Sequence, residues 1–190
     1  ALRRFAVDDA VGCVVLTGSG RGFCAGGDVK GMAAAGRDGP PPTLEARAQG
    51  LRDRMEASRL LHEIPKPTIA MINGPAAGAG LSMALACDLR YAVSGAKIGM
   101  NFVRIGLNPG MAAEFWASRD NHVLLREMLL TGAIYSSSDS RMKQLFNQVA
   151  SPEEIATAVD AAAQAIAANS PQSLSISLDL LRNPLLSREE

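Results

Sequence analysis

The sequence predicts a single α/β domain in which short, buried strands alternate with helices. An apolar, β-branched run at Val11–Thr17 is bounded by polar residues and glycine, and apolar residues recur at helical spacing from Leu44 to His62. Such a run is typical of a strand buried on both faces, as in parallel sheets. The 190 residues are enough to bury one core, and no repeat or linker indicates a second domain.

The same alternation continues along the chain. Pro65 and Pro67 end the first helix and introduce the second strand. We expect strands at Thr68–Ile72, Asp88–Val93 and Ala96–Met100, and helices over about Gly80–Ala86, Met111–Thr131, Ser151–Ala168 and Gln172–Leu181. Ser151 is followed by Pro-Glu-Glu, which predicts a capping box. Residues 1–150 would form the core, and residues 151–190 a C-terminal helical region of the same domain.

Charge and cysteine content narrow the classes of partner. Lys plus Arg and Asp plus Glu are both 19, so no global basic field would recruit nucleic acid or a membrane surface. Apolar stretches are broken well before the roughly 18 residues that a membrane helix needs. Cys13, Cys24 and Cys87 lack metal-ligand spacing, so we expect no metal. Their odd number and the absence of a visible signal peptide favour the reducing cytoplasm.

Two similar loops are the candidate sites of chemistry. Gly22–Asp28 follows the first strand, and Asn73–Ser82 follows the second; both are rich in glycine and alanine. Small residues let a ligand approach the main chain, and a helix N-terminus adds unpaired N–H groups. Two such N–H groups aimed at one point would form an oxyanion hole.

Other glycine-loop functions fit less well. A dinucleotide fingerprint would need glycine where the Gly18–Phe23 segment has Phe23, and the Gly-Lys-Ser/Thr of a phosphate-binding loop is absent. Loops that are small merely in order to pack tightly remain an alternative on spacing alone.

The loops resemble signatures of the enoyl-CoA hydratase/isomerase (crotonase) superfamily. Phe23–Asp28 resembles its pattern of Phe, a small residue, Ala-Gly, any residue, then Asp. Pro67–Gly80 resembles the second signature, which closes on a Cys-Asp pair matched by Cys87 and Asp88, and Ile98–Gly110 resembles the third. The resemblance implies a spiral of β-β-α units followed by C-terminal helices. We expect a chain truncated at its N-terminus relative to full-length members.

The resemblance also implies roles for individual residues. The main-chain N–H groups of Gly27 and Ala79 would hold a thioester oxygen. Asp28 would cap the next helix and brace the loop, and Ala25 would lie beside coenzyme A. An acyl-CoA thioester would be the substrate, with no cofactor beyond its own coenzyme A. Family members are usually trimers or hexamers, so a homo-oligomer is expected.

The resemblance implies no ordinary acid–base pair. Hydratases of this family place one glutamate on the second-loop helix and another in the third block, where this chain has Ser82 and Phe102. A third acidic position of some relatives is Gly110 here. Glu114 is the remaining acid–base candidate, and a solvated helix glutamate is the simpler interpretation of it. Ser82, Met100 and Phe102 are candidates for contact with the substrate, although core packing would also explain them.

Three functions therefore compete. The first is an acyl-CoA enzyme of the hydratase/isomerase type that stabilises an enolate without the usual glutamate pair. The second is a non-catalytic acyl-CoA binder. The third is a serine-type thioester hydrolase, because Gly80–Ala84 approaches a nucleophile elbow and His122 follows in an acceptable order. Against it, Ser82 lies ten residues after Ile72, whereas an elbow serine directly follows its strand.

Overall fold

A four-stranded parallel sheet lies at the centre of the molecule. The computed structural model describes residues 1–29, 31, 42–109 and 123–182. In this part of the chain the strand order is β1-β2-β4-β7, and every neighbouring pair is parallel. The strands are β1 (Val14–Thr17), β2 (Thr68–Ile72), β4 (Leu89–Val93) and β7 (Gln148–Ala150). The expected α/β class is confirmed.

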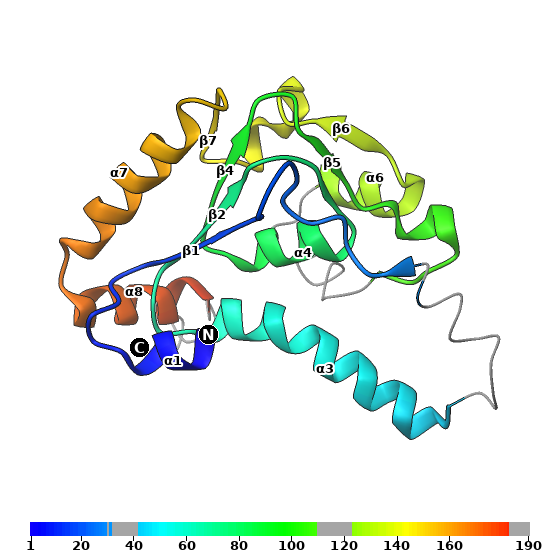
Figure 1. Ribbon diagram of the computed structural model, residues 1–190, viewed down its shortest axis with the longest axis horizontal. Coiled ribbons are helices and arrows are strands. Elements are labelled where there is room, and N and C mark those ends of the chain that lie inside the picture. Colours follow the sequence, from blue (N-terminus) through cyan, green and yellow to red (C-terminus); the bar gives the residue numbers. More distant parts are fainter. Residues whose placement is uncertain (30, 32–41, 110–122, 183–190) are drawn as a thin grey trace.

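A second, smaller sheet extends beyond the first on the side of α6 (Figure 1). It contains β3 (Ala76–Ala77), β5 (Lys97–Gly99) and β6 (Ile134–Ser136) in the order β3-β5-β6. Each β-β-α unit contributes one strand to each sheet: β2-β3-α4, then β4-β5-α6, then β6-β7-α7. This repeated step is the spiral of β-β-α units that the sequence predicts.

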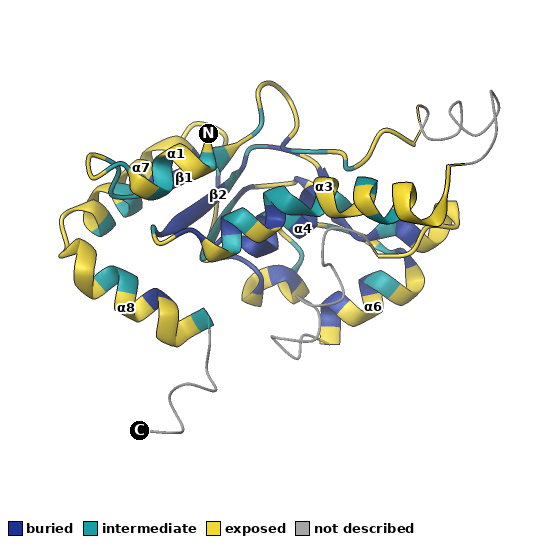
Figure 2. Cartoon of the chain, turned by 90° about the horizontal axis from the view of Figure 1, so that it is seen from below, coloured by how far each residue is buried: buried dark blue, intermediate teal, exposed yellow. Residues whose placement is uncertain are grey.

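The helices surround the two sheets. They are α1 (Leu2–Val7), α3 (Leu44–Glu63), α4 (Ala79–Ala86), α6 (Val123–Thr131), α7 (Ile155–Ala167) and α8 (Pro171–Arg182), with 3-10 turns η1 (Asn101–Ile105) and η2 (Ser140–Gln144). Figure 2 shows α4 largely buried and α3, which packs on it, largely exposed. The small, apolar residues of α4 explain this burial, because a helix that is apolar on all sides belongs in a core.

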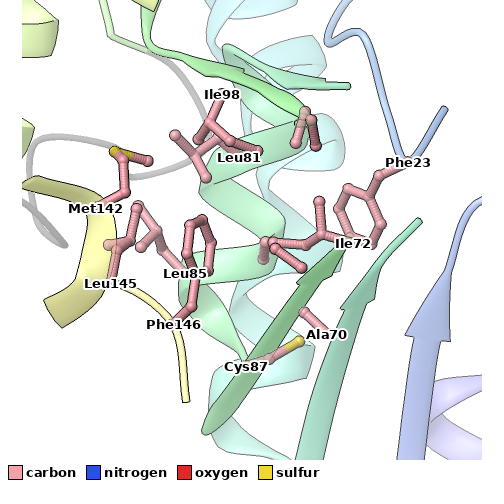
Figure 3. Close-up of a cluster of buried hydrophobic side chains, with 14 of the residues drawn as sticks. Phe23, Ala70, Ile72, Leu81, Leu85, Cys87, Ile98, Met142, Leu145 and Phe146 are labelled. Carbon is pink, nitrogen blue, oxygen red and sulfur yellow. The ribbon is translucent and has the colours of Figure 1, made fainter. Parts of the chain in front are cut away.

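The hydrophobic core lies between α4, the central sheet and η2 (Figure 3). Leu81 and Leu85 of α4 point into it, and Phe23 reaches it from the first glycine-rich loop, beside Ile72 of β2. Leu81 and Ile72 have no exposed surface, and Phe23 is 8% exposed. The first loop is therefore anchored in the core by one aromatic side chain at its centre.

Several boundaries differ from those expected. The first strand begins at Val14 instead of Val11, and the short β3, β6 and β7 were not expected. Helix α7 begins at Ile155 with Glu154 as its N-cap, so the helix start and capping box expected at Ser151 are wrong; the Ser151 N–H donates to the Glu154 carboxylate at 3.4 Å, outside the helix. Most of the helical segment expected over Met111–Thr131 lies outside the described residues, which include α6 from Val123 onward.

Candidate active site

The first loop follows β1 in the chain and lies along the second loop. The Phe23 and Cys24 N–H groups donate to the carbonyl oxygen of Pro75 at 3.1 and 3.2 Å. The Ala77 N–H donates in return to the carbonyl oxygen of Cys24 at 2.9 Å. A parallel bridge between Cys24 and Ala76 completes this pairing. The two loops that the sequence singled out are therefore joined by main-chain hydrogen bonds.

Glycine is required where the loops approach most closely. A Cβ built on Gly26, whose φ is +96°, would lie 2.9 Å from the Ala77 carbonyl oxygen and 3.5 Å from the Ala79 nitrogen. A Cβ on Gly80 would lie 2.2 Å from the Cys24 carbonyl oxygen. The main chain just before Gly27 is thus in contact with the start of α4.

Helix α4 begins at Ala79 and directs its N-terminus toward the first loop. Its N-cap, Gly78, has a φ of +53°, which favours glycine, and donates its N–H to the Gly99 carbonyl oxygen at 2.9 Å. The first N–H groups of a helix have no partner within the helix. Among the described residues, the N–H groups of Ala79 and Gly27 donate to no protein acceptor. Both are thus available to an oxygen atom of a ligand.

Asp28 caps the segment that follows the first loop. Its Oδ1 accepts the N–H of Gly31, three residues later, at 2.9 Å, which is N-cap geometry. This bond is the contact expected of a cap at Asp28, and most of the segment that it would cap lies outside the described residues. Ala25, Gly27 and Asp28 are all exposed, so this side of the loop is open to solvent.

The three candidate substrate-contacting residues of the second and third signatures are buried in the structure. Ser82 and Met100 have no exposed surface, and Phe102 is 8% exposed. The Ser82 hydroxyl donates to the Gly78 carbonyl oxygen at 3.2 Å. The Phe102 ring lies against Gly78, at 3.5 Å from a Cβ built there. Ser82 and Phe102 therefore contact the N-cap of α4, Met100 is buried, and none of the three is a carboxylate.

Glu114 lies outside the described residues, so the structure does not test it as an acid–base group. Among the described residues, no cluster of His, Cys, Asp and Glu could hold a metal ion. No helix in these ranges has the length and hydrophobicity needed to cross a membrane.

Asn73 is a residue of the site that the sequence interpretation missed. Its side chain joins the second loop to the turn Gly18–Gly22 that precedes the first loop: Nδ2 donates to the carbonyl oxygens of Gly18 and Gly20, and Oδ1 accepts the N–H of Gly18. In the sequence, Asn followed by Gly indicates a turn, and this local explanation hid the long-range role. The signal that remained was the position of Asn73 directly after a strand, beside the other loop.

Comparison with known proteins identifies the family. The family model for enoyl-CoA hydratase/isomerase matches residues 1–189. The chain belongs to the enoyl-CoA hydratase/isomerase family. The (E)-benzylidenesuccinyl-CoA hydratase of Thauera aromatica is 36% identical over 174 residues, covering 90% of this chain and 64% of its own. The mitochondrial enoyl-CoA hydratase of Pongo abelii is 32% identical over 176 residues, covering 90% of this chain and 56% of its own.

The fold agrees with solved structures of the enoyl-CoA hydratase/isomerase family. The crystal structure of an enoyl-CoA hydratase from Polaromonas sp. JS666 has a TM-score of 0.87 and 31% identity. That match covers 98% of this chain and 73% of the other. The chain therefore has the family's fold, but it spans only about 60% of the length of the two curated relatives named above.

Proposed function

We propose that this chain binds an acyl-CoA thioester and stabilises an enolate-type oxyanion with the N–H groups of Gly27 and Ala79. The observation that carries this proposal is the contact between the two loops: the main chain of Gly26 lies against the Ala79 nitrogen at the N-terminus of a buried helix. Two N–H groups directed at one point would favour a negatively charged oxygen, and the dipole of α4 would add to the effect. Removing one such donor typically slows an enzyme about 10²- to 10³-fold.

The reaction proposed is a hydratase/isomerase-type conversion that does not use the usual glutamate pair. Ser82 and Phe102 occupy the positions where the family resemblance places the two glutamates, and neither exchanges protons as a carboxyl group does. The Phe102 ring, which lies against Gly78, would line the acyl side of the site. The buried Ser82 and Met100 would support the second loop from the core. The exposed Ala25 and Asp28 would lie on the coenzyme A side. Glu114 remains the proposed acid–base group.

We further propose that the protein works in the cytoplasm in fatty-acid metabolism, as a homo-oligomer of trimer or hexamer type. Coenzyme A would enter as part of the substrate, and no separate cofactor is proposed. The family membership supports these statements, and the balanced charge of the chain is compatible with them.

The test removes a single main-chain donor. In Ala79→Pro the N–H is lost at the first position of α4, where the fixed φ of proline is tolerated. Leu44→Pro makes the same change at the first position of α3, far from the loops, and serves as the matched control. Purified protein is mixed with crotonyl-CoA, and the conjugated thioester absorbance is followed against a sample without enzyme.

The expected result is turnover by the wild type and by Leu44→Pro, and its loss in Ala79→Pro. Turnover by Ala79→Pro at the wild-type rate would contradict the proposed oxyanion hole. Binding of crotonyl-CoA by the wild type without turnover of any enoyl-CoA would favour the second candidate, a non-catalytic acyl-CoA binder. The absence of carboxylates at Ser82 and Phe102 is the observation that favours this candidate.

A further inference from the structure

The side chain of Asn73 makes three hydrogen bonds to the turn Gly18–Gly22, which leads into the first loop. Nδ2 donates to the carbonyl oxygens of Gly18 and Gly20 at 3.1 and 2.8 Å, and Oδ1 accepts the Gly18 N–H at 3.0 Å. The Thr17 hydroxyl lies 3.4 Å from the same Oδ1. A carboxamide supplies two donors and an acceptor in one plane, and no other short side chain has this set. The residue type therefore matches the loop that it holds.

These bonds act on a turn whose two ends approach each other closely. The chain doubles back tightly after β1, since a Cβ on Gly18 would lie 2.0 Å from the Gly22 carbonyl oxygen. Next to Asn73, a Cβ on Gly74 would lie 2.1 Å from the carbonyl oxygen of Arg21. The two ends of the Gly18–Gly22 turn are thus in contact with each other, and the turn also lies against the Asn73-Gly74 segment.

The same turn leads directly into the proposed oxyanion loop. After it, Phe23 enters the core, and Cys24 pairs with Pro75 and Ala77 through main-chain hydrogen bonds. From Asn73 to Ala79 and from Gly18 to Gly27 the two segments run side by side, and Asn73 is at the start of this pairing. A shift of the turn would therefore be passed along the loop to the Gly27 N–H.

We propose that Asn73 is a positioning residue that sets the spacing between the Gly27 and Ala79 N–H donors. It acts through the loop and does not touch the substrate. This inference rests on the proposed function, because it concerns the same pair of donors. Misplacement of reacting groups by about 1 Å costs on the order of 10²-fold in rate. Loss of the Asn73 hydrogen bonds would therefore be measurable even in a folded protein.

The test uses cinnamoyl-CoA, a conjugated thioester that absorbs further to the red when hydrogen bonds polarise its carbonyl group. The absorbance shift is measured for wild type, Asn73→Ala, Asn73→Asp and Asn147→Ala, and is normalised to the bound fraction from equilibrium dialysis. Asn73→Asp keeps the shape and the acceptor for the Gly18 N–H but loses both donors, so it maintains the test if Asn73→Ala does not fold. Asn147→Ala is the matched control: it removes an asparagine side chain of another segment, whose Oδ1 accepts the Arg90 N–H at 2.8 Å, and leaves the bonds of Asn73 intact.

The expected result is a red shift in wild type and Asn147→Ala, and a shift smaller by roughly half or more in folded, ligand-saturated Asn73 variants. An undiminished shift in the Asn73 variants would overturn the inference while leaving the proposed oxyanion hole in place, and a merely structural role would give that result together with a lowered melting temperature. Wild-type protein that binds cinnamoyl-CoA without any shift would contradict the proposed function, and this inference with it.

Discussion

Arg182, the last residue of α8, forms a bidentate ion pair with Asp88 at the C-terminal end of α4. Its Nη2 lies 2.7 Å from Oδ2 and 2.9 Å from Oδ1, and the Arg182 side chain is only 7% exposed. Asp88 also accepts the N–H and hydroxyl of Thr68, the first residue of β2, each at 2.8 Å. One carboxylate thus joins the C-terminal helix, the central sheet and the helix whose N-terminus forms the candidate site.

We expect Arg182→Ala to lower the free energy of unfolding by about 3 kcal/mol, because it leaves Asp88 largely buried without its counter-charge. The matched control is Arg141→Ala. Arg141 pairs with Asp139 at 2.9 Å but is 53% exposed, so its loss should cost no more than about 1 kcal/mol. Urea unfolding of the two variants measures the difference. Equal effects would show that the Asp88 pair is no stronger than a surface pair.

Gly80→Ala should destabilise the protein by about 2 kcal/mol or more, since the new methyl group would overlap the main chain of Cys24. Gly50→Ala is the control within α3, where the Cβ would meet only the end of the Arg54 side chain at 3.6 Å. There alanine should stabilise by roughly 0.5–1 kcal/mol, because it lowers the entropy of the unfolded chain. Thermal unfolding should therefore move in opposite directions for the two substitutions. A melting temperature of Gly80→Ala at or above that of the wild type would contradict the close approach of the loops.

The long elements could be predicted from the sequence, and the very short ones could not. The bounds predicted for the second strand, Thr68–Ile72, are those of β2, because two prolines precede the strand and an Asn-Gly-Pro turn follows it. Strand β3 has two residues, and its alanines show neither alternation nor β-branching. Such a strand exists because Ala76 pairs with Ile98 and Cys24, which are distant in sequence. The local sequence pattern cannot predict pairing with residues that are distant in the chain.

The candidate site divides in the same way. Both loops, their order and the cap at Asp28 could be predicted, because small residues and an Asn/Asp cap are local requirements. The burial of Ser82 could not, since it depends on distant segments that enclose α4. The hydrogen bonds from Asn73 to Gly18 join residues 55 positions apart in the chain. The residues next to Asn73 in the sequence do not indicate these bonds.

Cys87 should resist alkylation in the native protein at pH 8. Burial raises the pKa of its thiol from 9.0 to about 12, and burial raises that of Cys13 to about 11. Because the thiolate is the nucleophile, both groups stay neutral and slow until the chain unfolds. The raised pKa also means that the contribution of each thiol to stability is present below pH 9 and is lost between pH 9 and the folded pKa.

Mass spectrometry after a timed iodoacetamide pulse checks this expectation. In native protein at pH 8, Cys87 should remain unmodified, whereas in urea it should be labelled fully. Rapid labelling of Cys87 without denaturant would show that α4 opens readily, which the buried packing of this helix does not suggest.

Ser82→Ala should leave thioester binding, and any turnover, within about twofold of the wild type. The hydroxyl is fully buried in α4 and donates to the Gly78 carbonyl oxygen, which also accepts the Ser82 N–H at 3.1 Å. The carbonyl group thus keeps one donor in the variant, and the loss of stability should be about 1 kcal/mol. A serine-type hydrolase would instead lose all turnover and all labelling by a fluorophosphonate at this position. Comparison of crotonyl-CoA consumption and fluorophosphonate labelling in wild type and Ser82→Ala therefore separates the two mechanisms, and labelling of wild-type Ser82 would require α4 to leave the position in which the structure holds it.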